Sequence, residues 1–405
     1  MATPKLRFKE FDGDWFQSKI GEIFQVTSGS TPLRSDNRFF ENADIAWVKT
    51  TDLNNGLIEK TEEKISQIAL KETSVKILPK GTVFVAMYGG FNQIGRTGLL
   101  VHEAACNQAL SAIYPNEKID SYFLLTFLNH KVDDWKNFAA SSRKDPNITK
   151  SDVLAFPLKY PVKEEQTKIA SFLCAVDEKI SQLTQKHALL SQYKQGMMQK
   201  LFSQQIRFKA DDVSEFGEWE DKPLNEIASK RSGKNKDGSI SEVLTNSATQ
   251  GIIKQSDYFE REIVTESNLN GYYIVNLDDF VYNPRISVHA PVGPIKRNKK
   301  CLGVMSPLYT VFTVIQGNLK YLEYFFDSNF WHDYVKGVAN SGARHDRMNI
   351  TNKDFFDMPI LYPCLEEQTK IANFLSAIDQ KIEVVAQQIE QAKTWKKGLL
   401  QQMFV

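Results

Sequence analysis

The chain has 405 residues, 42% of them hydrophobic, and a formal net charge of +1. Its length and apolar content predict two or more globular domains, each with its own core. The near-neutral charge argues against a uniformly basic nucleic-acid binder, so any such binding must depend on local patches.

Cysteine and histidine spacing gives no sign of a metal site or a disulfide framework. The four cysteines show no C-x-x-C spacing, and the six histidines form no ligand pair. The N-terminus lacks an apolar signal region, and no window approaches the 18 apolar residues of a membrane span. We therefore expect a cytoplasmic protein that contacts no membrane.

The first half reads as a mixed α/β domain. After the opening LRFKEFDGDW, apolar runs rich in β-branched and aromatic residues predict strands, and a stretch of helical periodicity comes after them. The strand runs are 43–50, 81–90 and 106–114, and the helix is 121–138.

A glycine-rich segment, GGFNQIGRTG at 89–98, comes after one predicted strand and approaches a nucleotide-binding P-loop. It has Arg96 where the phosphate-binding lysine is required, so ATP binding is not expected. A glycine-rich turn carrying Asn92, Gln93 and Arg96 instead suits DNA, because backbone amides can approach phosphate while these side chains can read base edges.

From Glu164 onward the apolar residues repeat every 3.5 positions, as in a coiled coil. The pattern predicts a helix of about 39 residues that needs a partner for its apolar stripe. Its predicted seam is Ile169, Leu173, Val176, Ile180, Leu183, Leu190, Met197 and Leu201. His187 and Lys194 interrupt the seam, and we interpret both as stems that reach solvent.

The second half begins with IRFKADDVSEFGEW, an echo of the first opening. Runs 272–283 and 303–315 predict strands and 320–337 a helix, although this middle portion looks unrelated to that of the first half. Asn283-Pro284-Arg285 resembles the adenine-binding motif of methyltransferases but lacks its second proline and aromatic residue. Asp134-Trp135-Lys136 lacks the acidic partner of a nuclease motif, and no catalytic triad signature occurs.

Basic residues gather in two stretches of the second half. No acidic residue lies between Asp279 and Glu323, whereas six lysines and arginines do, and KRSGKNK at 230–236 is similarly basic. Such runs are often solvated loops, but they also suit phosphate binding.

The chain contains an internal repeat. EEQTKIASFLCAVDEKI at 164–180 recurs as EEQTKIANFLSAIDQKI at 366–382, with 13 of 17 positions identical and an offset of 202 residues. The second seam is Ile371, Leu375, Ile378, Ile382, Val385, Ile389, Leu399 and Met403, interrupted by Lys396.

Connectivity predicts that the two helices pair antiparallel. Only a few residues separate the first helix from the second domain, and that domain ends where the second helix begins. The predicted fold is therefore mixed α/β (α+β): two globular domains joined by two long antiparallel coiled-coil helices in a pseudo-twofold repeat. The predicted boundaries are 1–160, 161–205, 206–362 and 363–405.

Two domains, each followed by a helix opening with P-x-x-E-E-Q-x-x-I-A-x-F-L, resemble the specificity (S) subunit of type I restriction-modification enzymes. The resemblance covers the whole chain and implies that the domains are target-recognition domains and the helices are spacers. It further implies that each domain reads one half of a bipartite, asymmetric site in double-stranded DNA.

The same resemblance implies partners and the absence of catalysis. Two methylation (M) subunits would dock on the helices, and restriction (R) subunits would join through the methylation complex. The chain itself would hold no cofactor, because the methyl donor, ATP and magnesium would belong to those partner subunits. Two alternatives are a solitary DNA methyltransferase or nuclease with unrecognised motifs, and a coiled-coil protein scaffold.

Candidate DNA-binding residues are chosen for side-chain chemistry and loop position, not carried over from the family. Arginine suits guanine and Asn or Gln suits adenine, whereas lysine more often contacts phosphate. The candidates are Arg34, Arg38, Asn92, Gln93, Arg96, Arg143, Lys144, Lys234, Asn235, Lys236, Arg285, His289, Lys296, Arg344, His345 and Arg347. The segments SSRKDPNIT and SGARHDRMNIT contribute several of them from equivalent places before the two helices.

Overall fold

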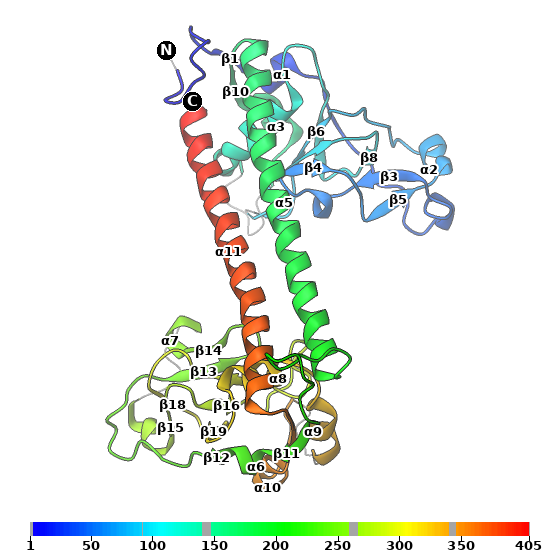
Figure 1. The fold of residues 1–405 in the computed structure, drawn as a ribbon. Coiled ribbons are helices and arrows are strands. Elements are labelled where there is room, and N and C mark those ends of the chain that lie inside the picture. Colours follow the sequence, from blue (N-terminus) through cyan, green and yellow to red (C-terminus); the bar gives the residue numbers. More distant parts are fainter. Residues whose placement is uncertain (1–2, 91, 140–146, 259–265, 340–345, 405) are drawn as a thin grey trace. The chain divides into compact units, whose positions relative to one another are not determined.

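A computed structural model of the chain describes residues 3–90, 92–139, 147–258, 266–339 and 346–404. The chain divides into two compact units, a first unit of residues 1–185 with 386–405 and a second unit of residues 186–385. Each holds a globular mixed α/β domain and parts of both long helices, which confirms the predicted fold class (Figure 1). Because the units divide each helix, the predicted domain boundaries stay predictions.

The first domain is built on a five-stranded sheet with a smaller three-stranded sheet. The large sheet has the spatial order β2 (Val26–Ser28), β9 (Leu110–Ile113), β6 (Val83–Ala86), β7 (Thr97–Leu100) and β4 (Gly56–Ile58). The small sheet has the order β5 (Glu63–Ile65), β3 (Ile45–Val48) and β8 (Ala105–Cys106). Strands β6, β7 and β9 are wholly buried, as expected for sheet strands covered on both faces.

The second domain repeats the core of this sheet despite its unrelated sequence. Its four-stranded sheet has the order β12 (Ala228–Lys230), β19 (Thr310–Val314), β16 (Phe280–Tyr282) and β17 (Ile295–Arg297). All neighbours in it are antiparallel, as they are among β2, β9, β6 and β7. Two antiparallel pairs complete it: the hairpin of β13 (Leu244–Ser247) with β14 (Gly251–Lys254), and β15 (Tyr273–Val275) with β18 (Gly303–Met305), which are distant in sequence. The two middle portions, whose sequences look unrelated, therefore share the topology of their core sheets.

A pair of strands closes each domain at the point where the chain enters and leaves it. Strand β1 (Phe16–Lys19) pairs antiparallel with β10 (Pro157–Tyr160), and β11 (Glu220–Pro223) pairs with β20 (Pro359–Tyr362). The pairing brings the opening of each domain beside the start of its long helix.

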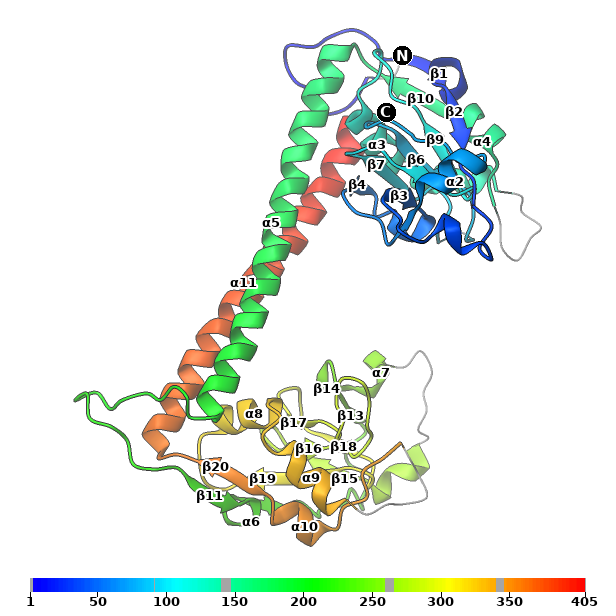
Figure 2. The same cartoon turned by 90° about the vertical axis from the view of Figure 1, so that its right-hand side faces the viewer.

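Short helices lie between and after the strands of both domains, and α1, α3 and α4 of the first have counterparts in α6, α8 and α10 of the second. In the first they are α1 (Ile20–Ile23), α2 (Gln67–Glu72), α3 (Ser121–His130) and α4 (Lys150–Ala155), with 3-10 turns at Asn37–Phe39, Thr50–Asp52 and Val132–Asn137. In the second they are α6 (Leu224–Ile227), α7 (Gln255–Tyr258), α8 (Leu319–Asp327), α9 (His332–Val338) and α10 (Asn352–Phe356), with a 3-10 turn at Glu266–Gly271. The predicted helices 121–138 and 320–337 thus each end early and continue as a second short segment (Figure 2).

The long helices are α5 (Lys163–Phe202) and α11 (Leu365–Met403), with 40 and 39 residues. Within the first unit, Ile169 and Leu173 near the start of α5 share a core with Leu399 and Met403 at the end of α11. Within the second unit, the end of α5 packs in the same way with the start of α11. Each unit therefore pairs the helices antiparallel, as predicted, and every predicted seam residue is buried or half-buried. Met198 is buried more fully than the predicted Met197.

The repeated EEQ motif joins each domain to its own helix. Glu165 is buried and accepts two hydrogen bonds from Arg7, at 2.8 and 2.7 Å, and Glu367 accepts the same pair from Arg207 at 3.1 and 2.7 Å. The indole Nε1 of Trp219 also donates to Glu367. A buried carboxylate needs such partners, so the openings LRF and IRF must lie at the helix starts.

The glutamine of the motif adds a second identical contact. Gln166 donates to the carbonyl of Pro161 at 2.9 Å and accepts from the amide of Asp120, the residue that caps α3. Gln368 likewise donates to Pro363 and accepts from the amide of Asn318, which caps α8. The motif thus fixes both the domain opening and its capped helix. We call these Glu and Gln contacts the domain anchor.

In both units, a tyrosine of the domain and a lysine of one long helix bind the same aspartate on the other long helix. In the first unit the hydroxyl of Tyr122 donates to Asp177 at 2.6 Å, and Lys396 pairs with the same carboxylate. In the second unit Tyr324 donates to Asp379 at 2.6 Å, and Lys194 pairs with it. The lysines that interrupt the seams are therefore ion-pair partners and not only solvent-reaching stems. Burial and the neighbouring carboxylate raise the pKa of both tyrosines, which keeps them neutral donors.

Replacing Glu367 with Gln should destabilise the second unit by about 2 to 4 kcal/mol, because Arg207 loses its charged partner in a buried setting. Calorimetric unfolding of the full chain measures this. The neighbouring Glu366 is exposed, so Glu366→Gln is a matched control expected to stay within about 0.5 kcal/mol. An equal effect of both substitutions would contradict the role assigned to the anchor.

Candidate nucleic-acid interface

The same hairpin in both domains carries several of the candidate DNA-binding side chains. In the first unit, residues 87–96 connect β6 to β7, and in the second, residues 283–294 connect β16 to β17. We call these segments the first and second tip loops. Because the two sheets share one strand order, the loops occupy the same topological position.

Glycine shapes the first tip loop. Gly89, Gly90 and Gly95 have positive φ angles, of 112°, 74° and 78°, which favour residues without a Cβ atom. A Cβ on Gly95 would lie 2.2 Å from the ring of the buried Trp135. The loop turns directly into strand β7 rather than into a helix, so it lacks the helix N-terminus of a phosphate-binding P-loop.

This turn presents the predicted polar residues. Asn92 is exposed, and Gln93 and Arg96 are half-exposed. Backbone hydrogen bonds from Gln93 to Gly90 and from Arg96 to Gln93 hold the turn closed. The carbonyl of Met87 accepts from Ile148, so the predicted segment before α4 lies beside this loop.

The second tip loop is held by buried amides. Asn283 donates to the carbonyl of Asn246 at 2.9 Å and accepts from the amide of Arg285. Asn246 in turn donates to the carbonyls of Val281 and Pro294. The Asn-Pro-Arg motif therefore supports the loop, and its Asn amide is not free to bind a base.

The segment before α10 pairs with this loop. Ile286 donates to the carbonyl of Asp346 and Met348 donates to that of Pro284, which sets Arg285 opposite Arg347. Arg285 and His289 are exposed. Arg347 is largely covered and lies 3.6 Å from Asp346. Three predicted residues from two distant parts of the sequence therefore meet here.

Arg34 and Arg38 lie elsewhere and have internal partners. Arg34 pairs with Glu63 at 2.6 Å and lies over the rings of Phe40 and Trp47. Arg38 pairs with Asp36 at 2.7 Å, and its hydrogen bond lowers the pKa of that carboxyl group. Their charges are thus already balanced within the first domain.

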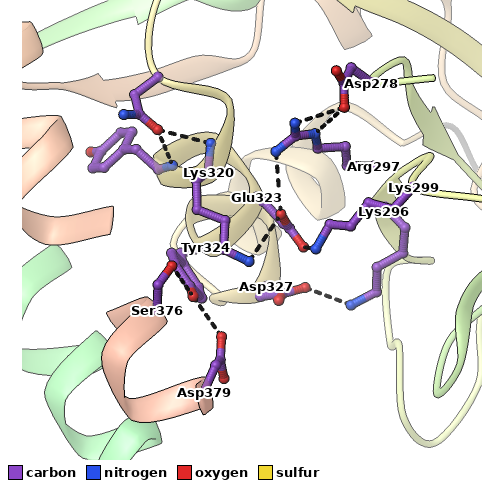
Figure 3. A network of polar contacts seen from close by, with 12 residues as sticks. Asp278, Lys296, Arg297, Lys299, Lys320, Glu323, Tyr324, Asp327, Ser376 and Asp379 are labelled. Carbon is purple, nitrogen blue, oxygen red and sulfur yellow. Dashed lines mark hydrogen bonds and ion pairs between the residues drawn. The ribbon is translucent and has the colours of Figure 1, made fainter. Parts of the chain in front are cut away.

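The basic stretch between Asp279 and Glu323 contains no acidic residue in sequence, but acidic side chains from outside the stretch contact it in the folded domain. Figure 3 shows Lys296 paired with Asp327 at 2.6 Å, Arg297 with Asp278, and both Lys299 and Lys320 with Glu323. Helix α8 lies beside β17 and supplies two of these carboxylates. Four of the six basic residues are therefore neutralised by acids that border the stretch in sequence, and the stretch does not act as one basic patch.

Asn235 is wrong as a DNA contact. It is 0% exposed, and its side-chain amide donates to the carbonyl of Ile240 and accepts from the same residue's amide group. The flanking Lys234 and Lys236 are exposed. Arg143, Lys144, Arg344 and His345 lie outside the described residues.

Val288 was not among the residues predicted from the sequence, and it is 97% exposed in the turn of the second tip loop. The available signal was a β-branched residue in a segment bounded by proline and glycine, where turn residues are expected. Asp134-Trp135-Lys136 forms a packing turn, with Trp135 buried in the core.

No cluster of metal-ligating side chains occurs among the residues that the structure describes. In the same residues, no helix combines the length and the apolar character needed to cross a bilayer.

Comparisons with known proteins agree with this architecture. The family described as type I restriction modification DNA specificity domain matches twice, at residues 12–192 and 217–394. The MjaIX specificity subunit of Methanocaldococcus jannaschii is 27% identical over 56% of this chain and 56% of its own length, so that match spans about half of the relative.

Two further relatives match along nearly their whole length. The MjaVIII specificity subunit of the same organism is 24% identical over 97% of this chain and 94% of its own. The S subunit structure from M. genitalium has a TM-score of 0.58 and 14% identity, and the match covers 100% of this chain and 99% of that one. Because the family matches both halves of the sequence and the fold agrees with that of an S subunit, the chain belongs to the type I restriction-modification DNA specificity family.

Proposed function

We propose that this chain is the DNA-reading subunit of a type I restriction-modification enzyme, in which each domain reads one half of a bipartite, asymmetric site. The observation that carries the proposal is the repetition of the domain anchor and of a core of four antiparallel strands, combined with tip loops that carry different side chains. Asn92, Gln93 and Arg96 occupy the first tip loop, whereas Arg285, Val288 and His289 occupy the second. Two domains that share a fold but carry different side chains in their tip loops suit an asymmetric target.

The second tip loop, in which Ser287 pairs with Ala290, has a shape that supports contact with a DNA groove. A two-stranded β-ribbon fits the major groove, where each base pair presents a distinct pattern of donors, acceptors and methyl groups. Arginine can pair with guanine there, and Asn or Gln with adenine. Arg96 and Arg285 have no ion-pair partner among the described residues, so their charges are available to DNA.

The long helices would serve as spacer and docking surface. We propose that they fix the separation of the half-sites and bind two methylation subunits, through which restriction subunits join. Each unit supports this with an exposed aromatic residue at equivalent helix positions, Trp395 in the first and Tyr193 in the second, which are 54% and 51% exposed. An identical partner could use both, because exposed aromatic residues are favoured at protein interfaces.

The chain itself would be non-catalytic. The methyl donor, ATP and magnesium would bind to the partner subunits. The near-P-loop and Asn-Pro-Arg motifs, the two sequence features closest to enzyme signatures, are both accounted for by loop structure.

Arg285→Ala should weaken binding of the reconstituted complex to its cognate duplex by about 5- to 150-fold, because one arginine–guanine pair is lost. Fluorescence anisotropy at fixed salt measures the affinity. Arg285→Lys keeps the charge but loses the bidentate geometry, so it should keep binding to non-specific DNA while losing discrimination. Unchanged discrimination in both variants would exclude Arg285 as a base-reading residue.

The isolated chain should transfer no methyl group to DNA when supplied with S-adenosylmethionine. Adding its methylation subunit should produce transfer at one split site, measured by incorporation of a radioactive methyl group. Incorporation by the purified chain alone would instead support the alternative of a solitary methyltransferase.

A further inference from the structure

Val288 occupies an unusual place for an apolar side chain. Ser287 and Ala290 exchange backbone hydrogen bonds of 3.0 and 3.1 Å, which leaves Val288 and His289 as the two residues of a tight turn. Turns are generally rich in Gly, Pro, Asn, Asp and Ser, whereas β-branched residues favour strands. Single exposed apolar residues are common on protein surfaces, so the residues around Val288 decide whether its exposure has a function.

Hydrogen bonds at the base of the loop hold this turn in place. The hydroxyl of Tyr282 donates to the carbonyl of Val292 at 2.9 Å, and Gly293 donates to Ala290. Gly293 has a φ of 80°, and a Cβ there would lie 2.0 Å from the carbonyl oxygen of Asn283. Together with the buried Asn283–Asn246 contacts, these bonds fix the loop before any ligand arrives, which lowers the entropic cost of binding.

The surroundings of Val288 point to DNA. Arg285 and His289 are exposed on the same loop, and Arg347 lies on the paired segment. The neighbouring acid is Asp346, which lies 3.6 Å from Arg347 and leaves Arg285 unpaired among the described residues. An apolar tip flanked by cationic side chains matches the pattern of a groove reader, in which phosphate contacts position the protein and short apolar groups contact bases.

We propose that Val288 reads a thymine by packing against its 5-methyl group in the major groove of the half-site bound by the second unit. This inference rests on the proposed function and adds a specificity-determining residue to it. Thymine is the base whose major-groove edge carries a methyl group. Valine is short and β-branched, which suits contact with a base edge better than insertion between stacked bases, where longer side chains such as Phe, Leu or Met act.

The experiment uses the complete chain with its methylation subunit and a duplex carrying the mapped target. Each thymine of the second half-site, on either strand, is replaced in turn by deoxyuridine, which removes only the methyl group. The wild-type complex should lose about fourfold in affinity at one position, the value expected for one buried methyl group. Val288→Ala should bind the thymine duplex about fourfold more weakly and show no further loss with deoxyuridine at that position.

Val213 provides the matched control, because it is 70% exposed in the same unit and Val213→Ala makes the same chemical change. This variant should keep the wild-type response to deoxyuridine. The inference is overturned if deoxyuridine has no effect at any position with the wild-type complex, or if the Val288→Ala complex keeps the fourfold response. It is also overturned if Val288→Ala impairs assembly with the methylation subunit instead of DNA affinity, or if the half-site contains no A·T pair. Failure of the wild-type complex to prefer any sequence would instead overturn the proposed function.

Discussion

The buried pairing of Glu165 with Arg7, and of Glu367 with Arg207, is the contact on which each unit depends. A buried carboxylate is stable only when a charged or hydrogen-bonding partner replaces water. Arg7 and Arg207 are those partners, so the opening of each domain is held at the start of its long helix. The adjacent glutamine then fixes the cap of α3 or α8. Because the same contacts hold the base of both domains, the tip loops are free to differ.

The two domains share their core sheet but differ in sequence and in their tip loops. Their core sheets have one strand order with dissimilar residues, because burial of apolar strands requires only pattern and volume. The tip loops are built differently. Positive-φ glycines shape the first loop, and buried amides brace the second. A common frame with separately constructed loops would allow the proposed DNA recognition to change without disturbing the helix pair.

Periodicity and repetition were sufficient to predict the long helices from the sequence. The seams were predicted from regular spacing and the antiparallel pairing from the short connections between helix and domain, and packing within each unit agrees with both. The EEQ repeat revealed the duplication, but the sequence did not show what these residues contact. Glu165 binds Arg7, which lies 158 residues away in sequence, and such a distant contact leaves no local signal. The stretch from Arg285 to Lys320 looked basic because its neutralising carboxylates approach only in the folded chain. Asn235 failed for the same reason, because burial of a loop amide depends on the surrounding fold.

The proposal that each domain reads one half-site independently can be tested in a living host. Residues 206–362 would be replaced by the corresponding domain of another family member, and the methylome of a host expressing the system would be sequenced. We expect one half-site to change while the other half-site stays the same. Two unchanged half-sites, or two changed ones, would show that the domains do not read DNA independently.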